Sequence, residues 1–179
     1  MEGSKPGDGG VFIFLPNKIT KKIYSWQSRF KEYVRMPKPH LTIMYPPYVS
    51  KDRWPGLRPQ ITDIARSIRP FTVDFKSTGY FSDPFFLYIR PGRTKELDRM
   101  NEKLAGLLKN ELTGLNLEPF IPHVSIGNFS TEETTCEAQI LLEELIEITD
   151  LQFTAGEICY TVLGDDFRWK IHDIISLGS

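Results

Sequence analysis

Short apolar runs alternate with amphipathic stretches along this chain, and the whole order occurs twice. Apolar runs bounded by proline predict strands, and apolar residues spaced three or four positions apart predict helices. In the first half these patterns predict a strand at 11–15, a helix at 19–34 and a strand at 40–45. A helix at 61–68, opened by Pro59, and a strand at 71–81 follow. The second half predicts the same order, with its second helix opened by a capping box, at 85–89, 97–108, 123–126, 130–145 and 151–163.

This repeated order indicates an internal duplication. We expect one domain at 11–179, with halves at 11–83 and 84–163 and an extra strand at 167–177. The segment 1–10 is small, polar and rich in glycine, so we expect a flexible leader there. Neither half contains the glycine-rich turn of a Rossmann or Walker loop, which argues against nucleoside-triphosphate chemistry.

The same five-residue motif stands at matching points of the two halves. Pro-His-Leu-Thr-Ile at 39–43 corresponds to Pro-His-Val-Ser-Ile at 122–126, and the two histidines are 83 residues apart. Alternate residues of a strand share a face, so each histidine points the same way as the hydroxyl residue that follows it. Their apolar neighbours then point into the core. The third histidine, His172, has neither the preceding proline nor the hydroxyl, and we expect it at the surface or in a structural role.

Two histidines with two hydroxyls suit attack on a phosphodiester. The reaction needs a base for the nucleophile and an acid for the leaving oxygen, and the imidazoles of His40 and His123 can do either near neutral pH. Thr42 and Ser125 can donate hydrogen bonds to the non-bridging phosphate oxygens. Because a duplicated fold has a pseudo-twofold axis, we expect the two pairs on facing walls of one cleft.

Two rival chemistries fit the sequence less well. A zinc site would need an Asp, Glu, Cys or second His at ligand spacing, and neither motif has one, so we expect no metal and no other cofactor. A serine hydrolase would place Ser125 in a Gly-x-Ser-x-Gly turn, which is not present.

Charge limits the partners. A net charge of −1 and a pI near 6.3 argue against a broad surface for duplex nucleic acid. Basic residues nevertheless concentrate between 18 and 38, and acidic residues between 132 and 150. Either these are two solvated helix faces of opposite sign, or Arg35 and Lys38 border a phosphate site.

Other features indicate an ordinary globular protein. No apolar stretch approaches the roughly 20 residues of a membrane-spanning helix, so we expect a cytoplasmic protein that binds no membrane. We expect it to be a monomer. Cys136 and Cys159 have no metal-ligand spacing and are interpreted as buried thiols.

The paired motifs resemble those of the two-histidine phosphoesterase superfamily, which includes the RNA 2′,3′-cyclic phosphodiesterases also called 2′-5′ RNA ligases. The resemblance covers nearly the whole chain after the leader. It implies a bilobal α+β fold in which two antiparallel sheets flank a cleft and each lobe contributes one His-x-Thr/Ser. It also implies cleavage of 2′,3′-cyclic phosphates or 2′-5′ phosphodiesters of RNA ends or small nucleotides without a metal, with ligation as the reverse reaction.

One position departs from that family's pattern. RNA-processing members often carry an arginine where this chain has Asn128, with Tyr45 at the equivalent place in the first half. This difference leaves open a small cyclic or 2′-5′ linked nucleotide as substrate. It also leaves open a non-catalytic module that binds a nucleotide or an RNA end in the same cleft.

Substrate contacts outside the motifs are predicted from residue type alone. Aromatic rings can stack on bases, although each can equally pack in the core. The aromatic candidates are Tyr45, Tyr48, Tyr80, Phe129, Tyr160 and Trp169. The predicted substrate-binding set is Tyr45, Lys38, Arg35, Tyr160, Trp169 and Asn128.

Overall fold

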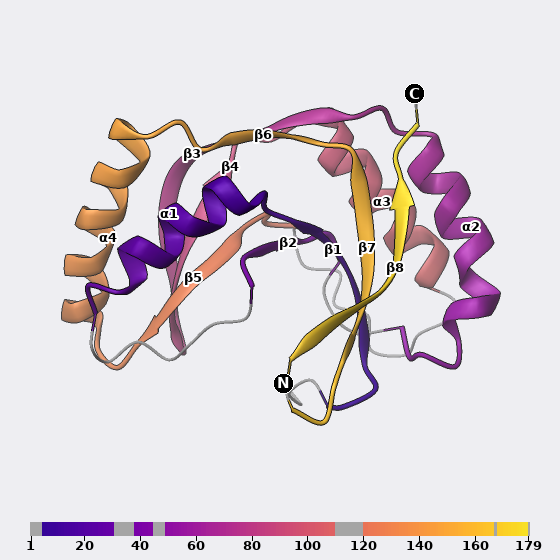
Figure 1. Ribbon diagram of the computed structural model, residues 1–179, viewed down its shortest axis with the longest axis horizontal. Coiled ribbons are helices and arrows are strands. Elements are labelled where there is room, and N and C mark those ends of the chain that lie inside the picture. The colour runs from indigo at the N-terminus through magenta and orange to yellow at the C-terminus, as the bar shows by residue number, and fades with distance from the viewer. Residues whose placement is uncertain (1–4, 31–37, 45–48, 110–119, 167, 179) are drawn as a thin grey trace.

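Two antiparallel sheets and four helices form the described part of the chain, so the predicted α+β class is confirmed (Figure 1). The computed structural model describes residues 5–30, 38–44, 49–109, 120–166 and 168–178. The first sheet has the order β2-β1-β7-β8, formed by His40–Thr42, Gly9–Phe14, Glu157–Leu163 and Trp169–Ser176. The second has the order β5-β4-β3-β6, formed by Val124–Phe129, Phe85–Pro91, Phe71–Ser82 and Gln152–Ala155.

The two sheets do not coincide with the two halves of the sequence. The predicted boundary between 83 and 84 falls in the turn of a hairpin, because Ser82 of β3 pairs with Phe85 of β4 in the second sheet. The single strand predicted at 151–163 is also wrong. It divides at Gly156 into β6, which pairs with β3, and β7, which pairs with β1 of the other sheet. Backbone pairing between distant segments, which local pattern does not encode, decides both points.

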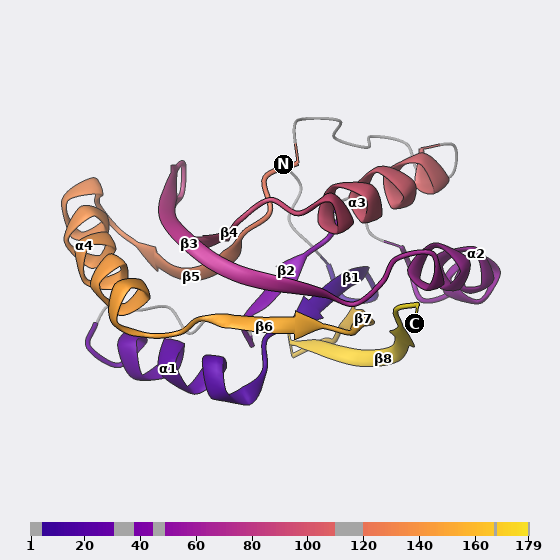
Figure 2. The same ribbon diagram turned by 90° about the horizontal axis from the view of Figure 1, so that it is seen from above.

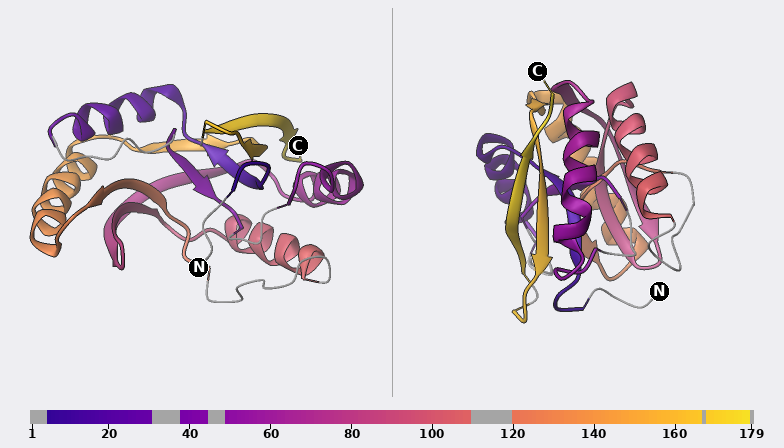
Figure 3. Two further views of the ribbon diagram at one scale, coloured as in Figure 1. Left: turned by 90° about the horizontal axis from the view of Figure 1, so that it is seen from below. Right: turned by 90° about the vertical axis from the view of Figure 1, so that its right-hand side faces the viewer.

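The helices gather at the two ends of the molecule (Figure 2). Helices α1 (Asn17–Gln27) and α4 (Glu132–Ile148) pack on the second sheet, where α1 contacts β5 and α4 contacts β3, β4 and β5. At the other end α2 (Trp54–Arg66) packs on β8, and α3 (Lys95–Leu108) packs on α2, as the end-on view of Figure 3 shows. Helix α1 follows β1 of the first sheet but packs on β5 of the second. Helix α3 follows β4 of the second sheet but packs on α2, which covers β8 of the first.

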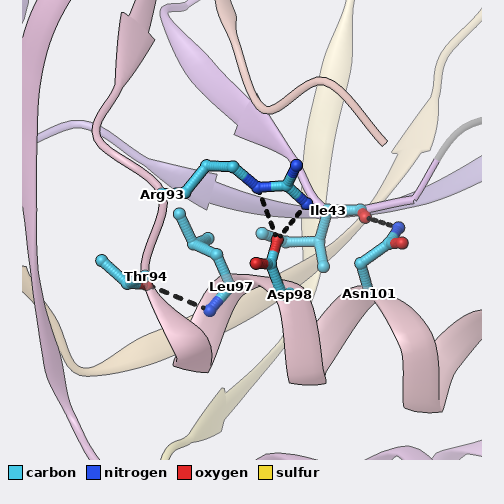
Figure 4. Close-up of polar contacts among 6 residues, drawn as sticks. All are labelled: Ile43, Arg93, Thr94, Leu97, Asp98 and Asn101. Atoms are coloured by element: carbon cyan, nitrogen blue, oxygen red, sulfur yellow. Dashed lines mark hydrogen bonds and ion pairs between the residues drawn. The ribbon is translucent and has the colours of Figure 1, made fainter. Parts of the chain in front are cut away.

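These crossing helices fasten the two motif strands in the same way. The side-chain amide of Gln27, at the end of α1, donates to the carbonyl oxygen of Ile126 at 2.7 Å. The amide of Asn101, on α3, donates to the carbonyl oxygen of Ile43 at 2.7 Å (Figure 4). Ile43 and Ile126 are the last residues of the two five-residue motifs. The backbone directly after each hydroxyl residue is thus bound by a helix that follows a strand of the other sheet.

Helix boundaries differ from the predicted ones for local reasons. Helix α1 ends at Gln27, and residues 31–34 of the predicted helix lie outside the described residues. Helix α2 begins at Trp54, so Pro59 lies inside it; Pro55 occupies the first turn, where proline removes no helical hydrogen bond. Helix α4 begins after Thr131, whose hydroxyl accepts from the backbone of the third following residue.

Gly9 and Gly10, which were predicted to belong to a flexible leader, are part of strand β1. Strand β1 begins at Gly9, and the backbone N–H of Leu163 donates to the carbonyl oxygen of Asp8 at 2.8 Å. A Cβ at Gly9 would collide with the ring and hydroxyl of Tyr160 and with the carbonyl oxygen of Val49. The glycine that suggested flexibility is therefore required by close packing within the sheet.

Candidate active site

The two motif strands are the edge strands of their sheets and contact one another. Strand β2, with the first motif, ends the first sheet, and strand β5, with the second, ends the other. Residues of β2 lie against residues of β5. The duplicated segments, 83 residues apart in the chain, are therefore neighbours in the fold.

The alternation predicted for both motifs is confirmed. The apolar members have no accessible surface: Leu41, Ile43, Val124 and Ile126 are each 0% exposed. The four chemical residues are half-buried: His40, Thr42, His123 and Ser125. Each strand thus has one face sealed in the core and one that reaches the surface.

Both imidazoles are held by the same hydrogen bond. Nδ1 of His40 lies 2.8 Å from the carbonyl oxygen of Lys38, and Nδ1 of His123 lies 2.8 Å from the carbonyl oxygen of Ile121. A carbonyl oxygen can only accept, so Nδ1 carries the proton in each ring. Nε2 is then the nitrogen available to exchange a proton with a ligand.

The electrostatic surroundings favour the neutral form of both rings. Burial lowers the pKa of His40 below its ordinary value, and the charge of His123 lowers it further, while the bond to Lys38 partly offsets both. Burial likewise lowers the pKa of His123, as does the charge of Arg90. The effect of the His123 charge on His40 agrees with the contact between β2 and β5.

The surroundings of the two histidines differ. In the first sheet, Phe14 pairs with His40 across the strands, and the ring of Phe12 stacks on His40 with centroids 4.1 Å apart. In the second sheet, Tyr88 pairs with Ser125, and its ring centroid lies 5.3 Å from that of His123. His40 is therefore backed by two phenylalanines, whereas His123 lies beside Tyr88 and one phenylalanine, Phe81, whose ring centroid is 5.1 Å away.

Four residues near the two histidines were not predicted from the sequence: Phe12, Phe14, Tyr88 and Arg90. They lie on β1 and β4, the apolar runs that were interpreted only as buried strands. The strand registers, rather than any local pattern, match Phe12 with Tyr88 as the residues opposite the two hydroxyl residues.

Three residues of the predicted substrate-binding set lie on the motif side of the sheets. The Lys38 ammonium lies 5.1 Å from the ring centroid of Phe14. Trp169 meets Phe12 edge-on with centroids 5.0 Å apart. Asn128 pairs with Phe86, and Phe86 lies on the same face of β4 as Tyr88, the partner of Ser125. Asn128 therefore shares the face of Ser125, because the ladder of β4 and β5 is irregular between 87 and 88. Strict alternation from Ser125 would have pointed Asn128 to the other face.

The prediction for Tyr160 is wrong. It is 1% exposed, its ring stacks on that of Trp54 with centroids 3.8 Å apart, and its hydroxyl donates to the carbonyl oxygen of Val49 at 2.8 Å. Its strand partner is Val11, so it lies on the face of the first sheet opposite to His40. Tyr160 is a core residue that fastens α2 to the sheet.

Other candidates also lie away from the motifs or outside the described residues. Tyr80 donates to a carboxylate oxygen of Glu132 on α4 at 2.7 Å, and Phe129 is 8% exposed within the core. Cys159 is buried as predicted, but Cys136 is exposed. His172 is exposed, in line with its predicted surface or structural role. Three predicted contacts lie outside the described residues: Arg35, Tyr45 and Tyr48.

A cavity of about 500 Å³ adjoins the first motif. The residues at 13–17 and 153–157 line it together with Lys38. Neither histidine does, so this space is not the reaction centre, although Phe14 and Lys38 connect it to the surroundings of His40. It lies where β1 diverges from the β6–β7 connection.

Within the described residues, no group of three or more His, Cys, Asp and Glu side chains could hold a metal ion. No helix built from these residues has the length and apolar character needed to span a bilayer.

Two antiparallel sheets that meet at edge strands carrying matched His-x-Thr/Ser motifs are the fold of a two-histidine phosphoesterase. The chain belongs to the 2′-5′ RNA ligase superfamily, whose family model matches residues 15–166. A Bacillus licheniformis protein that is named as a phosphoesterase is 24% identical over 172 residues, which cover 95% of this chain and 98% of its own. The RNA 2′,3′-cyclic phosphodiesterase of Bacillus subtilis is 23% identical over 141 residues, which cover 74% of this chain and 77% of its own.

Solved structures show the same fold. LigT of E. coli in its apo form superposes with a TM-score of 0.70 at 18% identity, covering 98% of this chain and 100% of its own. A Thermus thermophilus protein gives a TM-score of 0.73 at 16% identity, covering 96% of this chain and 99% of its own. LigT has also been crystallised with 3′-AMP, and that complex gives a TM-score of 0.70.

Proposed function

We propose that this phosphoesterase hydrolyses 2′,3′-cyclic phosphate or 2′-5′ phosphodiester bonds of RNA ends or small nucleotides, with His40 and His123 as its acid and base. The observation that carries the proposal is the matched state of the two rings. Each bonds its own backbone through Nδ1 and leaves Nε2 available. The Bacillus subtilis relative named as an RNA 2′,3′-cyclic phosphodiesterase supports the substrate class.

The reaction on a cyclic phosphate needs one neutral and one protonated imidazole. The neutral ring takes a proton from water at Nε2 as the water oxygen bonds to phosphorus. The protonated ring gives its Nε2 proton to the ribose oxygen whose bond to phosphorus breaks, which leaves a phosphomonoester. If a 5′-hydroxyl attacks in place of water and the 3′ oxygen leaves, the same two proton transfers give a 2′-5′ linkage. Ligation is therefore the reverse of cleaving a 2′-5′ phosphodiester to a 2′,3′-cyclic phosphate.

Thr42 and Ser125 suit stabilisation of the phosphate. Both are half-buried and share a face with their histidines, and each is followed by a motif carbonyl held from the opposite lobe. Hydroxyl donors fixed in this way can meet the charge that develops on non-bridging oxygens without reorganising. We therefore assign them as phosphate donors rather than nucleophiles.

The test is single replacement of each histidine. His40→Ala and His123→Ala are assayed with EDTA present on 2′,3′-cyclic nucleotides, RNA with a cyclic-phosphate end, and 2′-5′ oligoadenylates. Loss of a general acid or base costs about 10²- to 10⁴-fold in rate, and we expect both variants to lose activity to that extent. His172→Ala is the matched control and should keep wild-type rates, because that histidine is exposed and lies outside both motifs.

Three outcomes would contradict the proposal. Wild-type activity in either motif variant would remove the two-histidine mechanism. A requirement for stoichiometric zinc, with activity lost in EDTA, would indicate a metal hydrolase. Binding of the panel by the wild-type protein without turnover would indicate a non-catalytic nucleotide-binding module.

A further inference from the structure

Arg90 is the residue of this site that makes the two lobes chemically unequal. The ladder of β4 and β5 pairs Tyr88 with Ser125 and Ile89 with Val124, so its continuation brings Arg90 opposite His123. In the first sheet the residue opposite His40 is Phe14. The pseudo-twofold relation therefore matches a guanidinium beside one histidine with a phenyl ring beside the other.

The guanidinium of Arg90 is held in place but is not neutralised. Its Nη2 donates to the Tyr88 hydroxyl at 3.1 Å, and its Cζ lies 5.6 Å from the centroid of that ring. Its Nε is buried and has no hydrogen-bond partner. Among the described residues no carboxylate forms an ion pair with it. A buried cationic donor left unpaired is costly, which favours an anionic ligand at this position.

The neighbouring strand makes room for the tyrosine that holds this arginine. Gly79 of β3 pairs with Tyr88, and a Cβ at Gly79 would collide with the Tyr88 ring and hydroxyl. The phenol therefore lies across a glycine, with its oxygen beside Arg90. Gly79 of β3 thus leaves room for Tyr88 of β4, and Tyr88 holds the guanidinium of Arg90 beside the motif strand β5.

We propose that Arg90 is a phosphate-binding residue of this site, whose guanidinium donates to a non-bridging oxygen of the substrate, and that Tyr88 is its positioning residue. The inference rests on the proposed function and adds to it a direction for the substrate. A planar guanidinium matches two phosphate oxygens at once. The oxygen bound by Arg90 then lies on the side of His123 and Ser125, while Thr42 donates from the side of His40.

The experiment compares Arg90→Gln with Arg93→Gln. Arg93 is exposed, pairs with Asp98 and lies just beyond the same strand, so its replacement removes one positive charge without touching the site. Inorganic phosphate binding is measured by calorimetry, and the pKa of His123 by NMR titration. We expect Arg90→Gln to weaken phosphate binding and to lower kcat/KM for 2′,3′-cyclic AMP by about tenfold or more, since bonds to charged groups have this magnitude. The pKa of His123 should rise in Arg90→Gln and stay unchanged in Arg93→Gln.

The outcomes separate this proposal from the proposed function. Wild-type phosphate affinity in Arg90→Gln would overturn the role of Arg90 even if the cyclic substrate is hydrolysed. Weaker phosphate binding in Arg90→Gln would support that role even if the wild-type protein hydrolyses nothing on the panel. If Arg90→Gln does not fold, Tyr88→Phe decides, because it removes only the hydroxyl. Phosphate affinity reduced about threefold or more supports the proposal, and wild-type affinity overturns it.

Discussion

Replacing Gln27 with methionine removes the amide that holds the second motif strand while keeping a side chain of similar length. Gln27 is 4% exposed, and its bond to the carbonyl oxygen of Ile126 is buried. The variant loses this bond and leaves the carbonyl oxygen buried without a partner. We expect the free energy of unfolding to fall by about 1–3 kcal/mol. In a chain of this length that corresponds to a melting temperature lower by about 2–12 °C.

The assay is thermal unfolding followed by circular dichroism, with kcat/KM for 2′,3′-cyclic AMP measured on the same samples. Asn101→Leu is the matched variant from the other lobe. Its bond to Ile43 is only partly buried, so water can replace the lost donor and the loss of stability should be smaller. An unchanged melting temperature in Gln27→Met, or a larger loss in Asn101→Leu, would refute the reasoning that burial of the carbonyl sets the cost.

Two other properties of the site and its surroundings can be measured directly. Burial lowers the pKa of both His40 and His123, and the active form has one neutral and one protonated imidazole. We therefore expect kcat/KM to follow a bell-shaped pH profile with its maximum below pH 6.5. A maximum above pH 7 would contradict these pKa shifts. Tyr160→Phe should destabilise the protein by about 1 kcal/mol or more, because it removes a buried hydrogen bond, and should leave KM for the cyclic nucleotide unchanged. A raised KM at wild-type stability would return Tyr160 to the substrate-binding set.

The residues that carry the proposed chemistry could be predicted from sequence because their signal is local. Strand parity alone places His40 with Thr42 and His123 with Ser125, on the side away from four fully buried apolar residues. The duplication of the motif then separates these histidines from the exposed His172. Secondary structure was predicted for the same reason, since helix and strand periods are properties of a few consecutive residues.

Residues around the motifs could not be predicted in this way, because their position depends on pairing between distant segments. Tyr160 lies on the core face because its strand partner is Val11, and Asn128 reaches the face of Ser125 only through an irregularity in the ladder. Arg90 reaches the site because β4 lies beside β5. None of these registers is encoded in the residues next to the one that it orients.

By itself, then, the sequence determined the two motifs, the buried face behind each and the duplicated order of elements. Only the tertiary structure decided that β3 joins the second sheet and that α1 and α3 cross between the sheets. It also decided that Phe14 lies opposite His40, whereas the charge of Arg90 acts on His123. The physical reason is the range of the interactions. Side-chain alternation follows from the geometry of a single strand, whereas strand register and helix docking follow from a core that forms only when the whole chain has folded.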